Sequence, residues 1–154
     1  MYKVSVNTIY VYTNLEISKI DFDSRAVIEG SLFVAQKGVS VDGHLFIDKA
    51  IGLGATSVIC EILPEKKQEN ITFIQVDDSN TSLAIIASNF YDNPSSKLKL
   101  IGVTGTNGKT TIASLLYQLY KKAGFKVGLL STVQILVDTI VYESTHTTPD
   151  SVTI

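Results

Sequence analysis

The strongest constraint on the fold is a glycine-rich segment that lies between an apolar run and a helical pattern. Residues 98–103 are apolar apart from Lys99, and residues 105–111 read Gly-Thr-Asn-Gly-Lys-Thr-Thr. From Ile112 onward, apolar side chains recur at helical spacing. A strand, a glycine turn and a helix N-terminus in this order predict a phosphate-binding loop, because the turn lets backbone N–H groups converge on phosphate oxygens.

Two side chains give this loop its expected chemistry. Lys109 supplies a point charge for the phosphates, and the Thr110 hydroxyl can reach a magnesium ion. The usual pattern has a further glycine five residues before the Gly-Lys pair, but that position is Val103 here. The loop is therefore a variant form, Gly-Thr-Asn-Gly-Lys-Thr, with its nearest glycine at Gly105.

Composition favours a folded protein without a large charged surface. The chain has 154 residues, of which 45% are hydrophobic and 18% charged, and its net charge is −2. This balance predicts neither nucleic acid nor a membrane as a partner. Cys60 is the only cysteine and lies in an apolar run, so we expect a buried thiol and a cytoplasmic protein.

The pattern up to residue 99 predicts a small α/β domain. Short strands are expected within residues 4–35 and at 55–62 and 71–76. Helices are expected after Asp42, as an N-cap, and from about Asp78 to Phe90. Residues 89–99 show neither helical nor strand periodicity and are the predicted boundary between two domains. The expected organisation is a first domain at 1–92, a linker at 93–99 and a second domain at 100–154.

The second domain has the pattern of an incomplete parallel sheet. A helix at 108–123 ends at Gly124, and residues 127–131 read as a buried strand parallel to the strand at 98–103. Residues 134–142 alternate and predict a hairpin. Thr148 and Pro149 have the pattern of a helix start. Because a parallel sheet needs more strands and helices than these, we expect the chain to be the N-terminal part of a longer protein.

Three segments together resemble the Mur ligase family. They are Asp23-Ser24-Arg25 with Leu32 to Ala35, then Gly38 with Asp42-Gly43-His44, and then Gly105 to Thr111. Thr147-Thr148-Pro149-Asp150 adds to the similarity with the members that add the third residue of the peptidoglycan stem peptide. The resemblance implies a uridine-nucleotide domain followed by the start of a central ATP-binding domain.

The resemblance also implies roles for individual residues. Ser24 and the loop Val39-Ser40-Val41 would bind the uridine nucleotide, the loop through its backbone, and Thr147 and Thr148 would bind the muramoyl-peptide part. Lys109 would be catalytic and Thr110 would hold Mg²⁺. The ATP site would consist of Gly105, Thr106, Asn107, Gly108, Lys109, Thr110 and Thr111. From their own chemistry, Asp23 and Arg25 can pair with each other, and His44 is expected to be a structural or capping residue.

The implied function is an ATP-dependent amide ligase. It would activate the carboxylate of a UDP-N-acetylmuramoyl peptide as an acyl phosphate and transfer it to an amino acid, diaminopimelate or lysine. We expect a monomer whose residues 1–154 are inactive alone. The alternatives are the D-alanyl-D-alanine-adding Mur ligase, a stand-alone uridine-nucleotide binding module, and an unrelated phosphate-loop ATPase or kinase.

Overall fold

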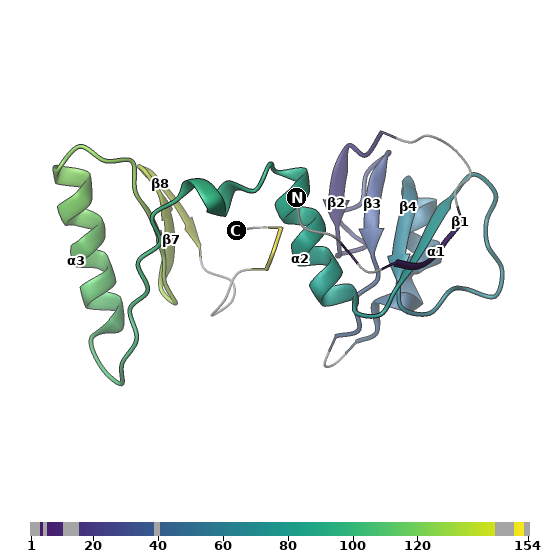
Figure 1. The fold of residues 1–154 in the computed structure, drawn as a ribbon, viewed down its shortest axis with the longest axis horizontal. Coiled ribbons are helices and arrows are strands. Elements are labelled where there is room, and N and C mark those ends of the chain that lie inside the picture. Colours follow the sequence, from purple (N-terminus) through teal and green to yellow (C-terminus); the bar gives the residue numbers. More distant parts are fainter. Residues whose placement is uncertain (1–3, 5, 11–15, 39–40, 144–149, 153–154) are drawn as a thin grey trace. The chain divides into compact units, whose positions relative to one another are not determined.

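The computed structural model describes all of the chain except residues 1–3, 5, 11–15, 39–40, 144–149 and 153–154. The chain divides into two compact units, residues 1–97 (unit 1) and 98–154 (unit 2). Each unit has its own sheet (Figure 1). The fold is α/β, as the sequence predicts.

Unit 1 is built on a five-stranded sheet in the order β1-β5-β4-β3-β2. Its strands are β1 Val6–Tyr10, β2 Lys19–Asp21, β3 Ser31–Val34, β4 Ala55–Cys60 and β5 Thr72–Val76. Strands β2 to β5 are parallel, and β1 joins the β5 edge antiparallel. Strands β3 and β4 are buried nearly throughout because both faces of the sheet are covered.

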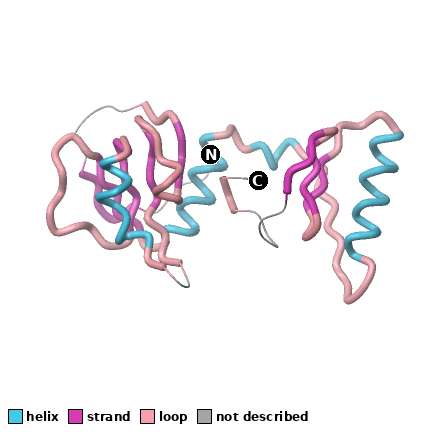
Figure 2. The backbone as a smooth tube through the Cα atoms, turned by 180° about the vertical axis from the view of Figure 1, so that it is seen from behind, coloured by secondary structure: helices cyan, strands magenta, loops and turns pink. Residues whose placement is uncertain are grey.

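Two α-helices cover this sheet, with the strands lying between them (Figures 1 and 2). Helix α1, Ile47–Gly52, follows the 3₁₀ turn η1, Gly43–Phe46, and α2 spans Ser79–Phe90. The α1 face forms a cluster that buries Val27, Phe33, Ala35, Ile47, Ala50, Ala55, Val58, Cys60, Ile71 and Phe73. Val34 and Ile59 are also buried and alternate with that set along β3 and β4, and α2 buries Leu83 and Ala87.

Both predicted helix starts in unit 1 are confirmed. The Asp78 carboxylate accepts hydrogen bonds from the N–H groups of Asn80 (2.9 Å) and Thr81 (3.3 Å) at the start of α2. The Asp42 carboxylate accepts one from the N–H of His44 (2.9 Å) at the start of η1. Such caps satisfy amide groups that have no partner inside the helix.

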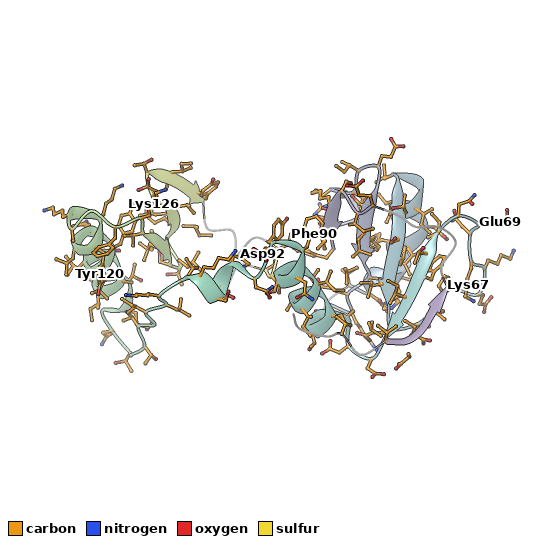
Figure 3. The ribbon with its side chains drawn as sticks, turned by 45° about the horizontal axis from the view of Figure 1, so that its top comes forward. Lys67, Glu69, Phe90, Asp92, Tyr120 and Lys126 are labelled. Atoms are coloured by element: carbon orange, nitrogen blue, oxygen red, sulfur yellow. The ribbon has the colours of Figure 1, made fainter. Side chains whose placement is uncertain are left out.

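The parallel strands place several polar loops at one edge of the sheet. Residues 22–30 follow β2, residues 35–42 follow β3, Glu61 follows β4, and Asp77 follows β5. Since β2 to β5 run in the same direction, these segments all leave from the carboxyl edge. In open α/β sheets this edge is where ligands bind. The charged loop at 64–70 lies elsewhere, with Lys67 and Glu69 at the outer margin of unit 1 (Figure 3).

Unit 2 contains one long helix and an antiparallel sheet. Helix α3 spans Lys109–Lys122, and the sheet has the order β6-β7-β8, formed by Gly128–Leu130, Gln134–Val137 and Ile140–Glu143. Asp138, at the tip of the predicted hairpin, has a φ of 54°. The helix at 108–123 and the hairpin at 134–142 are confirmed. A strand forms within 127–131, but only Leu129 of β6 is buried, so the prediction of a buried strand there is wrong.

The buried strand predicted at 98–103 is not formed. Residues 99–104 carry no regular structure, and Leu100 is 90% exposed. Strand β6 consequently pairs with β7 in antiparallel fashion rather than with a parallel strand before the loop. An apolar run becomes a strand only beside another strand edge, and within the described residues no strand pairs with this segment. The helix predicted from Thr148 and Pro149 lies outside the described residues.

Candidate functional site

The phosphate loop of unit 2 ends in a backbone conformation that favours glycine. Gly108 has a φ of 77°, in the left-handed region, and is the N-cap of α3. The α3 ladder begins with the Ile112 N–H, which donates to the Gly108 carbonyl (2.9 Å). The earlier amides of this helix point away from the ladder toward the loop. Together with the helix dipole, they make the end of α3 attractive to phosphate oxygens.

The Lys109 side chain lies across the loop that precedes it. Its Nζ donates to the carbonyls of Gly105 (2.5 Å) and Thr106 (3.3 Å). The ammonium group is therefore held at the loop, where a triphosphate would need a positive charge. Thr110 follows in the first turn of α3, and its hydroxyl is a suitable ligand for magnesium bound to a nucleotide, which needs only one or two protein ligands.

No other metal centre is evident in the part of the chain that the structure describes. Among those residues, no group of three or more His, Cys, Asp or Glu side chains is placed to hold a metal ion. The same residues include no helix with the length and apolar character of a membrane span. Cys60 is buried in β4, and burial raises the pKa of its thiol to about 11, so the thiol stays protonated near neutral pH.

Ser24 lies at the carboxyl edge of the unit 1 sheet, in the loop after β2. The residue is only 7% exposed. The neighbouring Asp23 and Arg25 form a two-pronged ion pair, with Arg25 Nη2 2.6 Å and Nε 3.1 Å from Asp23 Oδ2. The two residues that flank Ser24 are therefore paired with each other, as the chemistry of Asp23 and Arg25 predicts.

The Asp23–Arg25 pair gives a pH prediction. Hydrogen bonds from the Arg25 guanidinium, and then from its backbone N–H, lower the pKa of Asp23 from 3.8 to about 2. A lowered pKa in the folded state stabilises the fold above pH 4, and this contribution is lost as the pH falls toward 2. We expect carbon NMR titration to place the Asp23 midpoint near pH 2 and Arg25→Ala to move it toward 3.8. Lys97→Ala, which removes the exposed pair with Asp92, should leave it unchanged; a midpoint insensitive to Arg25→Ala would contradict the assignment.

The loop from Gln36 to Gly43, here called the nucleotide loop, follows β3 at the same edge. The Gly43 N–H donates to the Gln36 carbonyl (2.7 Å), and the Gly38 N–H donates to the Val41 carbonyl (3.0 Å). A Cβ added at Gly43 would lie 2.6 Å from the Gln36 oxygen, so the loop can close this tightly only with glycine there. Val41 is 54% exposed, and Val39 and Ser40 lie outside the described residues.

His44 has a structural role in this region, as its position predicts. Its Nδ1 lies 2.6 Å from Asp42 Oδ1, and its Nε2 accepts the N–H groups of Glu61 (2.9 Å) and Ile62 (3.2 Å). An Nε2 that accepts two N–H groups carries no proton, so the ring is neutral with its proton on Nδ1. The backbone N–H of His44, and then its ring, hold the pKa of Asp42 below its ordinary value.

Sequence reasoning missed Glu61, which connects this region to α2. Its carboxylate accepts hydrogen bonds from the N–H (3.0 Å) and hydroxyl (2.8 Å) of Ser79. The available signal was its position directly after the buried strand β4, where a charged side chain lies at the carboxyl edge.

The predicted site residues divide between the two units. Ser24 and Val41 lie at the carboxyl edge of unit 1, in loops after the neighbouring strands β2 and β3, and the phosphate loop lies in unit 2. Thr147 and Thr148 are outside the described residues. The structure therefore brings Ser24 and Val41 to one edge of the unit 1 sheet and keeps the phosphate-loop residues together at the start of α3.

Comparisons with known proteins match both units. Residues 16–91 match the model described as Mur ligase family, catalytic domain, and residues 103–154 match the Mur ligase middle domain. The chain is 54% identical to the UDP-N-acetylmuramoyl-L-alanyl-D-glutamate–2,6-diaminopimelate ligase of Cytophaga hutchinsonii, over all of this chain and 32% of that protein. It thus spans about a third of the length of such relatives.

Solved structures of similar proteins agree in fold. The MurF ligase of Thermotoga maritima in complex with ADP is 36% identical, with a TM-score of 0.52, covering 68% of this chain and 23% of the other. A UDP-N-acetylmuramoyl-L-alanyl-D-glutamate–2,6-diaminopimelate ligase superposes with a TM-score of 0.61 over 89% of this chain and 28% of the other, at 23% identity. The second likeness concerns the fold alone.

Proposed function

Because this chain belongs to the Mur ligase family, we propose that it is the N-terminal part of an ATP-dependent ligase that adds diaminopimelate to UDP-N-acetylmuramoyl-L-alanyl-D-glutamate. The observation that carries the proposal is the 54% identity to a diaminopimelate ligase over the whole chain. The likeness to the ADP-bound MurF ligase, at 36% over 68% of the chain, supports an ATP site in unit 2. Diaminopimelate is favoured over lysine by the name of this relative.

We assign the binding of the uridine nucleotide to residues 1–92, a linker to 93–99, and the beginning of the ATP domain to 100–154. Ser24 and Val39-Ser40-Val41 would contact the nucleotide, and Thr147 and Thr148 the muramoyl peptide. The position of Ser24 supports this assignment, since this nearly buried residue lies in the loop after β2, at the sheet edge where ligands bind in open α/β folds.

In the proposed reaction, ATP with Mg²⁺ supplies the phosphoryl group that activates the substrate carboxylate. Phosphate oxygens would be held by the loop from Gly105 to Thr111 and by the first amides of α3. The Lys109 ammonium offsets the repulsion between the phosphates and the carboxylate, and it stabilises charge on the transferring group. The Thr110 hydroxyl would hold the metal. The fit rests on the left-handed Gly108 and on Lys109 Nζ at the loop carbonyls.

We further propose that residues 1–154 are inactive alone and act in the cytoplasm as part of a longer monomeric chain. Unit 2 supports this, because helix α3 exposes a stripe of large apolar side chains at helical spacing: Ile112 (49%), Leu115 (59%) and Leu119 (62%). Apolar stripes of this kind are normally covered by protein. About two thirds of the relative's sequence has no counterpart in this chain. We propose that the corresponding part of the longer protein covers the apolar stripe of α3.

The binding test uses calorimetry with UDP-N-acetylmuramoyl-L-alanyl-D-glutamate. We expect the chain to bind this ligand and Ser24→Ala to weaken the affinity by about threefold to tenfold, the effect of losing one hydrogen bond. The control is Ser95→Ala, an exposed serine of η2, Pro94–Lys97, which should bind like the unsubstituted chain. No binding at millimolar ligand would contradict the binding role assigned to unit 1.

Turnover separates the remaining alternatives. The complete gene product should form the diaminopimelate adduct in the presence of ATP. A stand-alone nucleotide module would bind the ligand without turnover, and a D-alanyl-D-alanine-adding ligase would use the dipeptide with the UDP-tripeptide instead.

A further inference from the structure

The imidazole ring of His44 connects the nucleotide loop to the end of β4. Among the described residues of the loop, the Gly43 N–H donates to the Gln36 carbonyl and the Gly38 N–H to the Val41 carbonyl. The connection to β4 comes from His44, the residue directly after the loop. Its Nε2 accepts two backbone N–H groups, from Glu61 at 2.9 Å and Ile62 at 3.2 Å. One aromatic nitrogen therefore joins the loop to the carboxyl end of β4.

The other ring nitrogen points back into the loop. His44 Nδ1 donates to Asp42 Oδ1 at 2.6 Å, and the same carboxylate oxygen accepts the His44 backbone N–H at 2.9 Å. The imidazole thus acts as a bridge, donating to the loop through one nitrogen and accepting from the strand end through the other. Its side chain is only 12% exposed, so water has little access to replace it.

The strand end that receives the ring is itself fixed. The Glu61 carboxylate accepts hydrogen bonds from the Ser79 N–H and hydroxyl at the start of α2, and the Gln75 amide donates to the Glu61 carbonyl at 3.0 Å. A second tie runs from the Gln36 amide to Asn80 Oδ1 at 2.7 Å. These hydrogen bonds therefore connect the loop to β4, β5 and α2.

We propose that His44 is a positioning residue for the uridine nucleotide: its neutral imidazole holds the end of the nucleotide loop, at Asp42 and Gly43, against the end of β4. The inference rests on the proposed function of unit 1. The loop would bind through its backbone, so its affinity depends on where its amides and carbonyls lie, and a ligand need not then order the loop on binding. His44 contacts no substrate in this role.

The test compares two substitutions by calorimetry with UDP as the probe and by thermal unfolding. His44→Phe keeps a ring but removes both hydrogen-bonding nitrogens, and it should weaken UDP binding by about tenfold because two N–H groups lose their acceptor. His44→Gln can present an oxygen near the position of Nε2, and it should recover most of that affinity. Gln68→Ala removes another side-chain bond of unit 1, to Asp48, and should not change UDP affinity.

Two NMR readouts separate positioning from a general loss of stability. Long-range proton–nitrogen spectra should show His44 as the Nδ1–H tautomer in the unsubstituted chain. In His44→Phe, the Gly38 and Gly43 amides should exchange faster with solvent while amides in β3 and β4 keep their protection. If His44→Phe fails to fold, His44→Gln decides: near-normal affinity with protected loop amides supports the proposal, and a loss of affinity as large as tenfold overturns it.

The outcomes also distinguish this inference from the proposed function. If the unsubstituted chain binds no uridine nucleotide, the function assigned to unit 1 fails and the positioning role fails with it. If the chain binds UDP but His44→Phe binds within twofold of it, the positioning role alone is overturned. An Nε2–H tautomer in the unsubstituted chain would overturn it as well.

Discussion

Lys109→Ala in the complete ligase should lower turnover by about 100-fold to 1,000-fold, the cost of removing one group that stabilises transition-state charge. The ammonium lies at the phosphate loop, 2.5 Å from the Gly105 carbonyl, where it is placed to offset the charges of ATP and the substrate carboxylate. Steady-state formation of the adduct measures the effect. Binding of the uridine nucleotide by calorimetry should remain unchanged, because that role is assigned to unit 1.

The matched control for this prediction is Lys126→Ala. Lys126 lies in unit 2 after α3, is exposed, and is remote in sequence from the phosphate loop (Figure 3). Its removal changes the net charge by the same amount and should leave turnover within about twofold. If Lys109→Ala also stayed within a few fold of the unsubstituted enzyme, the catalytic role of Lys109 would be wrong.

Phe73→Ala should destabilise unit 1 by about 3–5 kcal/mol, as expected for emptying a phenylalanine site in a core. Phe73 lies on the interior strand β5 and is fully buried, with Val58 beside it on β4 and Tyr10 beside it on β1. It belongs to the cluster between the sheet and α1, so the cavity would open where the two layers meet. Urea unfolding followed through far-ultraviolet circular dichroism measures the change.

Phe90→Ala is the control for the core substitution. Phe90 ends α2 and is 41% exposed, and its ring packs edge-on against Tyr91 with centroids 5.1 Å apart (Figure 3). Its truncation removes the same atoms from a largely solvated position and should cost about 1 kcal/mol or less. Equal losses for the two variants would show that Phe73 is not part of a tightly packed core.

Local patterns were sufficient for most elements of the chain. The strands β3, β4 and β5 and helix α2 were predictable because each buries side chains whose spacing is set by its own backbone geometry. Asp42 was predictable as an N-cap, and the start of α2 near Asp78 was predictable too, because a cap bonds only two or three residues ahead. The domain boundaries at 92 and 100 and the individual site assignments stay predictions.

The sequence by itself determined the composition of the phosphate loop, the helix that follows it, and the charge and hydroxyl that the loop carries. Tertiary structure alone decided that residues 99–104 lie exposed without strand pairing and that β6 pairs antiparallel with β7. It also decided that His44 joins the nucleotide loop to Glu61 and Ile62, 17 and 18 residues away. The physical reason is the same in each case: strand pairing and backbone acceptors depend on which edge lies alongside, and that neighbour is distant in the sequence.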